Sequence, residues 1–348
     1  MIRIALLLVF VFCLQSCTSL AYYWEKIEGH SEILNKQRPI QDVIDDPKTT
    51  QEIKQRLINA REARKFASEV LKLPENDSYR NYVDIGRDYV VWTVVATPPY
   101  SIKPKEWCFI IVGCLSYRGY FSKQSAEDFA AELRKRNMDV YVAGTKAYST
   151  LGWFDDPLLN TMLYKSEAYR IGIIFHELAH QQMYADSDTA FNEAFATTVE
   201  LQGIKHWFTL ADKQQLYADY VAAKNRDKDF KNLLKQAQEN LKSIYALEQS
   251  DNVLESKKMQ VFKKLKNQYQ KFKQRWSDYN GYDKWMSQPL NNAHLALVAT
   301  YNNWVPALFQ LFEQSNHDYK IFYKKIEQLK DLDKQQREVK LNKLMGSQ

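Results

Sequence analysis

Two histidines four residues apart, with a glutamate directly after the first, lie in the stretch FHELAHQQMYADSDTAFNEAFATTVE, residues 175–200. On an α-helix, positions i and i+4 share a face, so His176 and His180 can approach one cation. The preceding residues IGIIF are apolar and proline-free, which predicts a buried helix in which Gly172 is the only weak helix former. An uncompensated burial of two histidines and a carboxylate is costly, so the pattern favours a metal site over a plain surface helix.

The pattern H-E-x-x-H indicates zinc (Zn²⁺) and hydrolytic chemistry. Imidazole is a good zinc ligand, and three protein ligands leave a fourth coordination position for water. We expect Glu177, beside that open position, to act as general base and then as general acid in peptide hydrolysis. The sequence therefore predicts a zinc metallopeptidase with His176 and His180 as two of the ligands.

The third ligand is predicted to be a carboxylate. A third histidine in the pattern H-E-x-x-H-x-x-G-x-x-H is absent, because Asp186 stands at the sixth position after His180. Glu193 and Glu200 follow His180 by thirteen and twenty residues. Their separation of seven places both on one helix face, two turns apart. The spacing alone leaves both glutamates as candidates.

The composition favours helices. Glycine and proline number only 10 and 9 in 348 residues, which argues against an all-β sandwich. Residues 79–117 contain β-branched and aromatic runs that predict two or three strands. We expect a mainly α fold with a small β-sheet (α+β), in which a zincin-like metallopeptidase core carries additional long helices. The lysine-rich residues 211–275 are expected to present a solvated helix face.

The N-terminus predicts export. An apolar run over residues 4–14 follows one arginine and is too short to span a bilayer, so residues 1–16 are predicted to be a signal peptide. Residues 14–17, LQSC, resemble a bacterial lipobox, which implies lipidation of Cys17 and a membrane anchor there. An ordinary signal peptide with an incidental cysteine is the alternative. Because Thr18 and not aspartate follows, we expect a periplasm-facing lipoprotein of the outer membrane.

The mature chain, residues 17–348, is expected to form a single domain that is helical from about residue 205 onward. Its remaining cysteines, Cys108 and Cys114, are predicted to form a disulfide in an oxidising compartment, with two buried strand thiols as the alternative. The formal charge of +6 is spread along the chain with no dense basic block before residue 226, so no nucleic-acid partner is expected. The sequence does not indicate an oligomeric state.

Three blocks carry a family resemblance: GCLSYRGYF at 113–121, AYSTLGWFDDPL at 147–158, and FHELAHQ with DTAFNEAFAT further on. Together they are similar to the bacterial family of predicted zinc aminopeptidases that are exported lipoproteins, over roughly residues 20–330. The resemblance implies an aminopeptidase acting on peptide substrates. Two alternatives remain: an envelope endopeptidase, or a non-catalytic zinc-binding lipoprotein that serves as a scaffold or chaperone.

The segment NEAFA, residues 192–196, resembles the metal-binding segment of the gluzincins, both the alanyl-aminopeptidase and the thermolysin types. This resemblance implies Glu193 as the third ligand and leaves Glu200 as an alternative ligand, as a residue that supports the site, or as an ordinary residue of the helix surface. The connection from His180 is shorter than in those families. Tyr148, in the loop before the motif, is the candidate that we prefer for stabilising the oxyanion of the transition state, with Tyr117 as the alternative.

Overall fold

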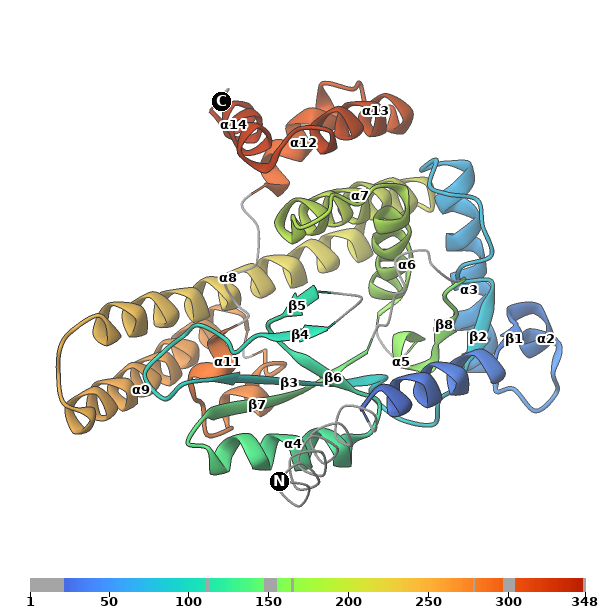
Figure 1. The fold of residues 1–348 in the computed structure, drawn as a ribbon. Coiled ribbons are helices and arrows are strands. Elements are labelled where there is room, and N and C mark those ends of the chain that lie inside the picture. The colour runs from blue at the N-terminus through green and yellow to red at the C-terminus, as the bar shows by residue number, and fades with distance from the viewer. Residues whose placement is uncertain are drawn as a thin grey trace, which may run out of the picture. The chain divides into compact units, whose positions relative to one another are not determined.

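The computed structural model describes residues 22–109, 113–146, 155–163, 166–277, 279–296 and 304–346. They are predominantly helical with small sheets (Figure 1), which confirms the mainly α prediction. No helix in these ranges has the length and hydrophobicity needed to cross a membrane. The chain forms two compact units, each built from three stretches: Met1–Gln37, Ile85–Lys146 and Leu233–Leu297 in unit 1, and Arg38–Asp84, Ala147–Asn232 and Val298–Gln348 in unit 2.

The sheet of unit 1 is a three-stranded antiparallel one in the order β6-β3-β7. Its strands are β3 (Val91–Thr97), β6 (Arg118–Tyr120) and β7 (Asp139–Thr145). Because side chains alternate along a strand, Val94 and Ala96 pack on α4 (Lys123–Lys135), while Val95 packs on α11 (Asn292–Ala296). The two helices therefore cover opposite faces of the sheet (Figure 1).

A separate hairpin of unit 1 contains Cys108 and Cys114. Strands β4 (Trp107–Phe109) and β5 (Gly113–Leu115) pair antiparallel, and Cys108 stands opposite Cys114. A disulfide joins the two residues. Both are exposed, so they are not the buried strand thiols of the alternative.

Long helices complete unit 1: the second part of α8 (Gln214–Tyr245), α9 (Asp251–Arg275) and the short α10 (Asp283–Met286). Residues 22–35 form a further helix. The buried Lys258 of α9 links that helix to the sheet, because its ammonium lies 2.7 Å from an Asp139 carboxylate oxygen and donates to the Pro99 carbonyl at 3.1 Å. A buried charge is tolerated when it is paired and hydrogen-bonded in this way.

Unit 2 is built around α3 (Gln51–Glu69), α6 (Glu167–Gln182) and α7 (Thr189–Leu210). A small sheet joins β1 (Arg38–Pro39), β2 (Asn81–Val83) and β8 (Leu158–Leu159), with β1–β2 antiparallel and β2–β8 parallel. The C-terminal helices contribute to the same core, since Phe195 of α7 contacts Phe322 with ring centroids 6.0 Å apart. The remaining helices of the unit are α2 (Ile40–Asp45), α5 (Asn160–Leu163), α12 (Val305–Glu313), α13 (Tyr319–Lys330) and α14 (Lys334–Met345).

Two glycines allow α6 and α7 to pack closely. A Cβ added at Gly172 would lie 2.7 Å from Ile204 Cδ1 and 3.3 Å from Glu200 Cγ. A Cβ added at Gly203 would lie 2.7 Å from the Phe175 ring. The helix-weakening glycine that precedes H-E-x-x-H thus has a packing role: it brings α7 against the helix that carries both histidines.

His294 of α11 is buried in unit 1. Its ring stacks on Tyr141 with centroids 4.2 Å apart, and its Nδ1 lies 2.8 Å from Asn291 Oδ1. Its Nε2 has no hydrogen-bond partner within the described ranges. Burial lowers the pKa of His294 from 6.5 to about 4, so the fold favours the neutral ring.

We therefore predict that His294 stabilises the protein above pH 6.5 and that this stabilisation is lost as the pH falls from 6.5 to 4. The loss amounts to about 3 kcal/mol of unfolding free energy. Urea unfolding at pH 7 and pH 4 measures it, with His294→Gln as the reference in which all carboxylates still titrate. Equal losses in the two proteins would contradict the prediction.

Candidate metal centre

Helix caps set the ends of α6 and α7. The Ser166 hydroxyl accepts a hydrogen bond from the Tyr169 N–H at 3.3 Å and starts α6. The Asp188 carboxylate accepts from the Phe191 N–H at 3.2 Å and starts α7. Asp188 is itself buried and paired with the buried Arg337 of α14. The N-terminus of α7 is therefore fixed by a side-chain cap and an ion pair.

The return from α6 to α7 is closed by Asn192. Its side-chain amide donates to the Ala185 carbonyl at 2.8 Å, and its Oδ1 accepts from the Ala185 N–H at 2.8 Å. This side chain is almost completely buried. The reciprocal pair holds the short connection against the first turn of α7, which is where Glu193 lies.

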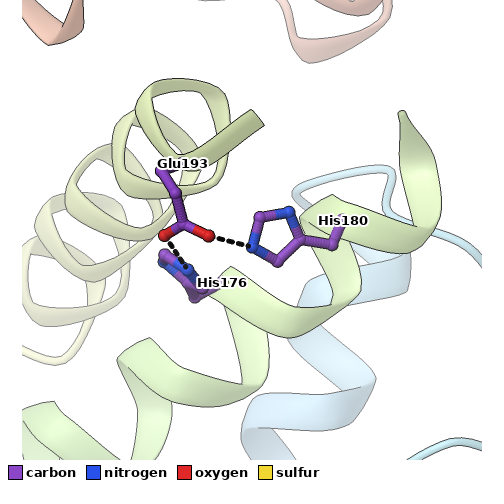
Figure 2. A group of neighbouring side chains, drawn as sticks. All are labelled: His176, His180 and Glu193. Atoms are coloured by element: carbon purple, nitrogen blue, oxygen red, sulfur yellow. Dashed lines mark ion pairs between the residues drawn. The ribbon is translucent and has the colours of Figure 1, made fainter. Parts of the chain in front are cut away.

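His176, His180 and Glu193 converge at this point (Figure 2). The Nε2 of His176 lies 3.5 Å from one Glu193 carboxylate oxygen, and the Nε2 of His180 lies 3.4 Å from the other. One ligand atom from each residue lies within 4.8 Å of the others. Ligand atoms about 2.1 Å from a tetrahedrally coordinated ion are about 3.4 Å apart, so the spacing fits a metal ion held by these three groups.

His176 and Glu193 shift each other's pKa. Burial alone would lower the pKa of His176, but hydrogen bonds to Glu193 and Glu200 outweigh it and raise that pKa to about 10. Burial alone would raise the pKa of Glu193, but the hydrogen bonds and charges of His176 and His180 hold it below its ordinary range. At neutral pH and without a metal, Glu193 is thus ionised and His176 is protonated, so metal binding has to displace a proton from His176.

Glu200 lies on the other side of the His176 ring. Its Oε2 is 3.0 Å from His176 Nδ1, whereas the Glu193 carboxylate faces Nε2. Its Oε1 accepts from the Lys224 ammonium at 2.6 Å and from the Tyr220 hydroxyl. Burial would raise the pKa of Glu200, but the charge of Lys224, followed by His176, lowers it to about 2. Glu193 therefore lies beside the Nε2 atoms of both histidines, whereas Glu200 lies beside Nδ1 of His176.

Three further site residues were predicted: Glu177, Tyr148 and Cys17. The structure describes Glu177 alone among them. Glu177 is half-buried in α6, and its negative charge contributes to the raised pKa of His176. Tyr148 and Cys17 lie outside the described residues, as does the predicted signal peptide.

Sequence reasoning missed Tyr220 and Lys224, since the lysine-rich segment was expected to be a solvated face. Tyr220 is 6% exposed, and Lys224 contacts the buried Glu200. The available signal was an aromatic residue and a lysine at i and i+4, which share a helix face. Nothing in the sequence singles out this lysine among its neighbours, because its partner lies on another helix.

Comparison with protein families gives a match over nearly the whole chain. The model of a family described as "Putative aminopeptidase" matches residues 21–341. Comparison with curated proteins and with solved structures gave no match. The match includes both helices that carry His176, His180 and Glu193, and the chain therefore belongs to this aminopeptidase family.

Proposed function

We propose that this protein is a zinc-dependent aminopeptidase with a gluzincin-type centre in a zincin-like core. The observation that carries the proposal is the approach of both histidine Nε2 atoms to the two oxygens of Glu193, at 3.5 and 3.4 Å. Two imidazoles and one carboxylate are a zinc donor set, whereas magnesium and calcium prefer oxygen ligands alone. Membership of the aminopeptidase family supports amino-terminal cleavage.

In this proposal His176, His180 and Glu193 hold the ion. When bound, zinc supplies a Lewis acid that lowers the pKa of water and polarises the scissile carbonyl. Glu177 takes the proton of the attacking water and delivers it to the leaving amine. Glu193 and His176 are partly exposed, and the proposal has the substrate approach from this side of the site.

Two alternative functions can be compared with this site: an endopeptidase and a non-catalytic zinc-binding protein. An endopeptidase would use the same groups on peptides without a free amino terminus. A non-catalytic scaffold or chaperone would hold zinc structurally, and structural sites are normally closed by four protein ligands. The group found within the described ranges has three potential protein ligands, which supports a catalytic zinc site over a structural one.

We further propose export and attachment to the outer membrane through lipid on Cys17, with the protein facing the periplasm. The support is the lipobox-like LQSC and the Cys108–Cys114 disulfide, which is typical of oxidising compartments. In a bacterial host, Cys17→Ser should abolish incorporation of labelled palmitate and move the protein from the membrane to the soluble fraction. Cys13→Ser, in the predicted signal peptide, should leave both unchanged. Wild-type protein without label would contradict lipidation.

Metal binding is tested on the purified, metal-stripped protein. We predict one zinc ion per chain and stabilisation by about 4 kcal/mol when free zinc exceeds the dissociation constant a thousandfold. Glu193→Gln should weaken zinc binding by more than about 100-fold, because it removes a ligand rather than a supporting group. Glu69→Gln, at an exposed position of α3, is the control. Wild-type affinity in Glu193→Gln would rule out Glu193 as a ligand.

Catalysis is tested with Glu177→Gln, which should retain zinc but lose about 10²–10⁴-fold in kcat, since it cannot accept a proton. Reporter peptides with free and with blocked amino termini are hydrolysed side by side, again with Glu69→Gln as control. Turnover of free-amino peptides only is expected. Turnover of blocked peptides alone would replace the aminopeptidase by an endopeptidase, and a zinc-loaded wild type that cleaves neither would exclude the enzyme.

A further inference from the structure

Glu200 is a buried carboxylate for which the proposed reaction has no direct use. It is 7% exposed and lies seven residues after Glu193, two turns along the same face of α7. Both of its oxygens are engaged: Oε2 with His176 Nδ1 at 3.0 Å, and Oε1 with the Lys224 ammonium at 2.6 Å and the Tyr220 hydroxyl. Residues of α6, α7 and α8 thus meet at one carboxylate, all of them within unit 2.

We propose that Tyr220 and Lys224 of α8 are positioning residues of the metal centre, which act by holding Glu200 so that Glu200 fixes the His176 ring. The proposal rests on the proposed function, because the ring orientation matters only where His176 binds a metal.

A metal that binds His176 displaces the proton of Nε2, and the hydrogen bond to Glu200 then holds the remaining ring proton on Nδ1. A neutral imidazole that donates from Nδ1 has its lone pair on Nε2, the atom that faces Glu193. If the ring turned over about its Cβ–Cγ bond, Nδ1 would lose Glu200 and Nε2 would leave Glu193. The Glu200 carboxylate therefore opposes this rotation and sets the tautomer.

The other histidine has no such support. His180 Nδ1 has no hydrogen-bond partner among the residues that the structure describes, and this ring is kept in place by burial, with 6% exposed. His176 is more exposed, at 18% of its side chain. Packing constrains the more exposed ring less, so the hydrogen bond carries more of its orientation.

Because the charge of Glu200 is buried, its Oε1 atom, which points away from His176, also needs hydrogen-bond partners. Tyr220 and Lys224 are spaced i and i+4, so both reach Oε1 from one face of α8. The lysine neutralises the carboxylate, and the hydroxyl restricts its direction. Lys228, one turn further along the same helix, is exposed.

The test compares Lys224→Gln, Lys224→Arg and Tyr220→Phe with the control Lys228→Gln, all in the full-length protein. Zinc affinity is measured by competition with a chromogenic chelator. We expect about 10–100-fold weaker binding for Lys224→Gln, about fivefold for Tyr220→Phe, near wild-type binding for Lys224→Arg, and no change in the control. If Lys224→Gln does not fold, Tyr220→Phe, which loses a single hydroxyl, provides the comparison.

A second measurement separates positioning from a general loss of stability. Each folded protein is saturated with Co²⁺, and its visible ligand-field spectrum is recorded. A variant that is merely less stable keeps the wild-type spectrum once it is saturated, whereas a displaced His176 changes it. We expect a changed spectrum in Lys224→Gln and its rescue in Lys224→Arg.

The outcomes distinguish this proposal from the proposed function. The positioning role would be overturned, and the metal centre left intact, by one result. In that result Lys224→Gln and Tyr220→Phe have the same zinc affinity and cobalt spectrum as Lys228→Gln. A wild-type protein that binds neither Zn²⁺ nor Co²⁺ would overturn the metal centre itself, and the positioning role with it.

Discussion

The reciprocal hydrogen bonds between the Asn192 side chain and the backbone of Ala185 determine where α7 begins relative to α6. They satisfy the N–H and the carbonyl of the buried Ala185, and the Asp188 cap and its ion pair with Arg337 fix the same helix end. Glu193 follows Asn192 directly, so the hydrogen bonds of Asn192 also fix the position from which the Glu193 carboxylate reaches the two histidines. The fit of the three donor groups to a metal ion depends on this local geometry.

Glu193 and Glu200 lie on the same face of α7, but the close packing of α6 on α7 gives them different surroundings. Seven residues correspond to about 10 Å along a helix, so Glu193 and Glu200 cannot contact the same atom of His176. Gly172 leaves room for Glu200 beside α6, and the carboxylate then approaches Nδ1. The imidazole lies between two carboxylates, one at each nitrogen, and the hydrogen bonds to them outweigh the effect of burial on its pKa.

Much of the fold and half of the site could be predicted from local patterns. The apolar run before H-E-x-x-H predicted a buried helix, and the scarcity of glycine and proline predicted a mainly helical protein. The sheets were less predictable: β1, β2 and β8 are two or three residues long, and they pair across large separations in sequence. Tyr220 and Lys224 were missed for a related reason, because a lysine on a polar helix carries no mark of a buried partner elsewhere.

By itself the sequence determined that two imidazoles share one helix face and that Glu177 stands between them, and it predicted a carboxylate as the third ligand of a metal site. Helical periodicity could not distinguish Glu193 from Glu200, because a separation of seven places both on the same face. The tertiary structure decided which glutamate faces Nε2 and which faces Nδ1. The physical reason is the position of the α6–α7 packing, set by the Asn192 turn at one end and by Gly172 and Gly203 further along.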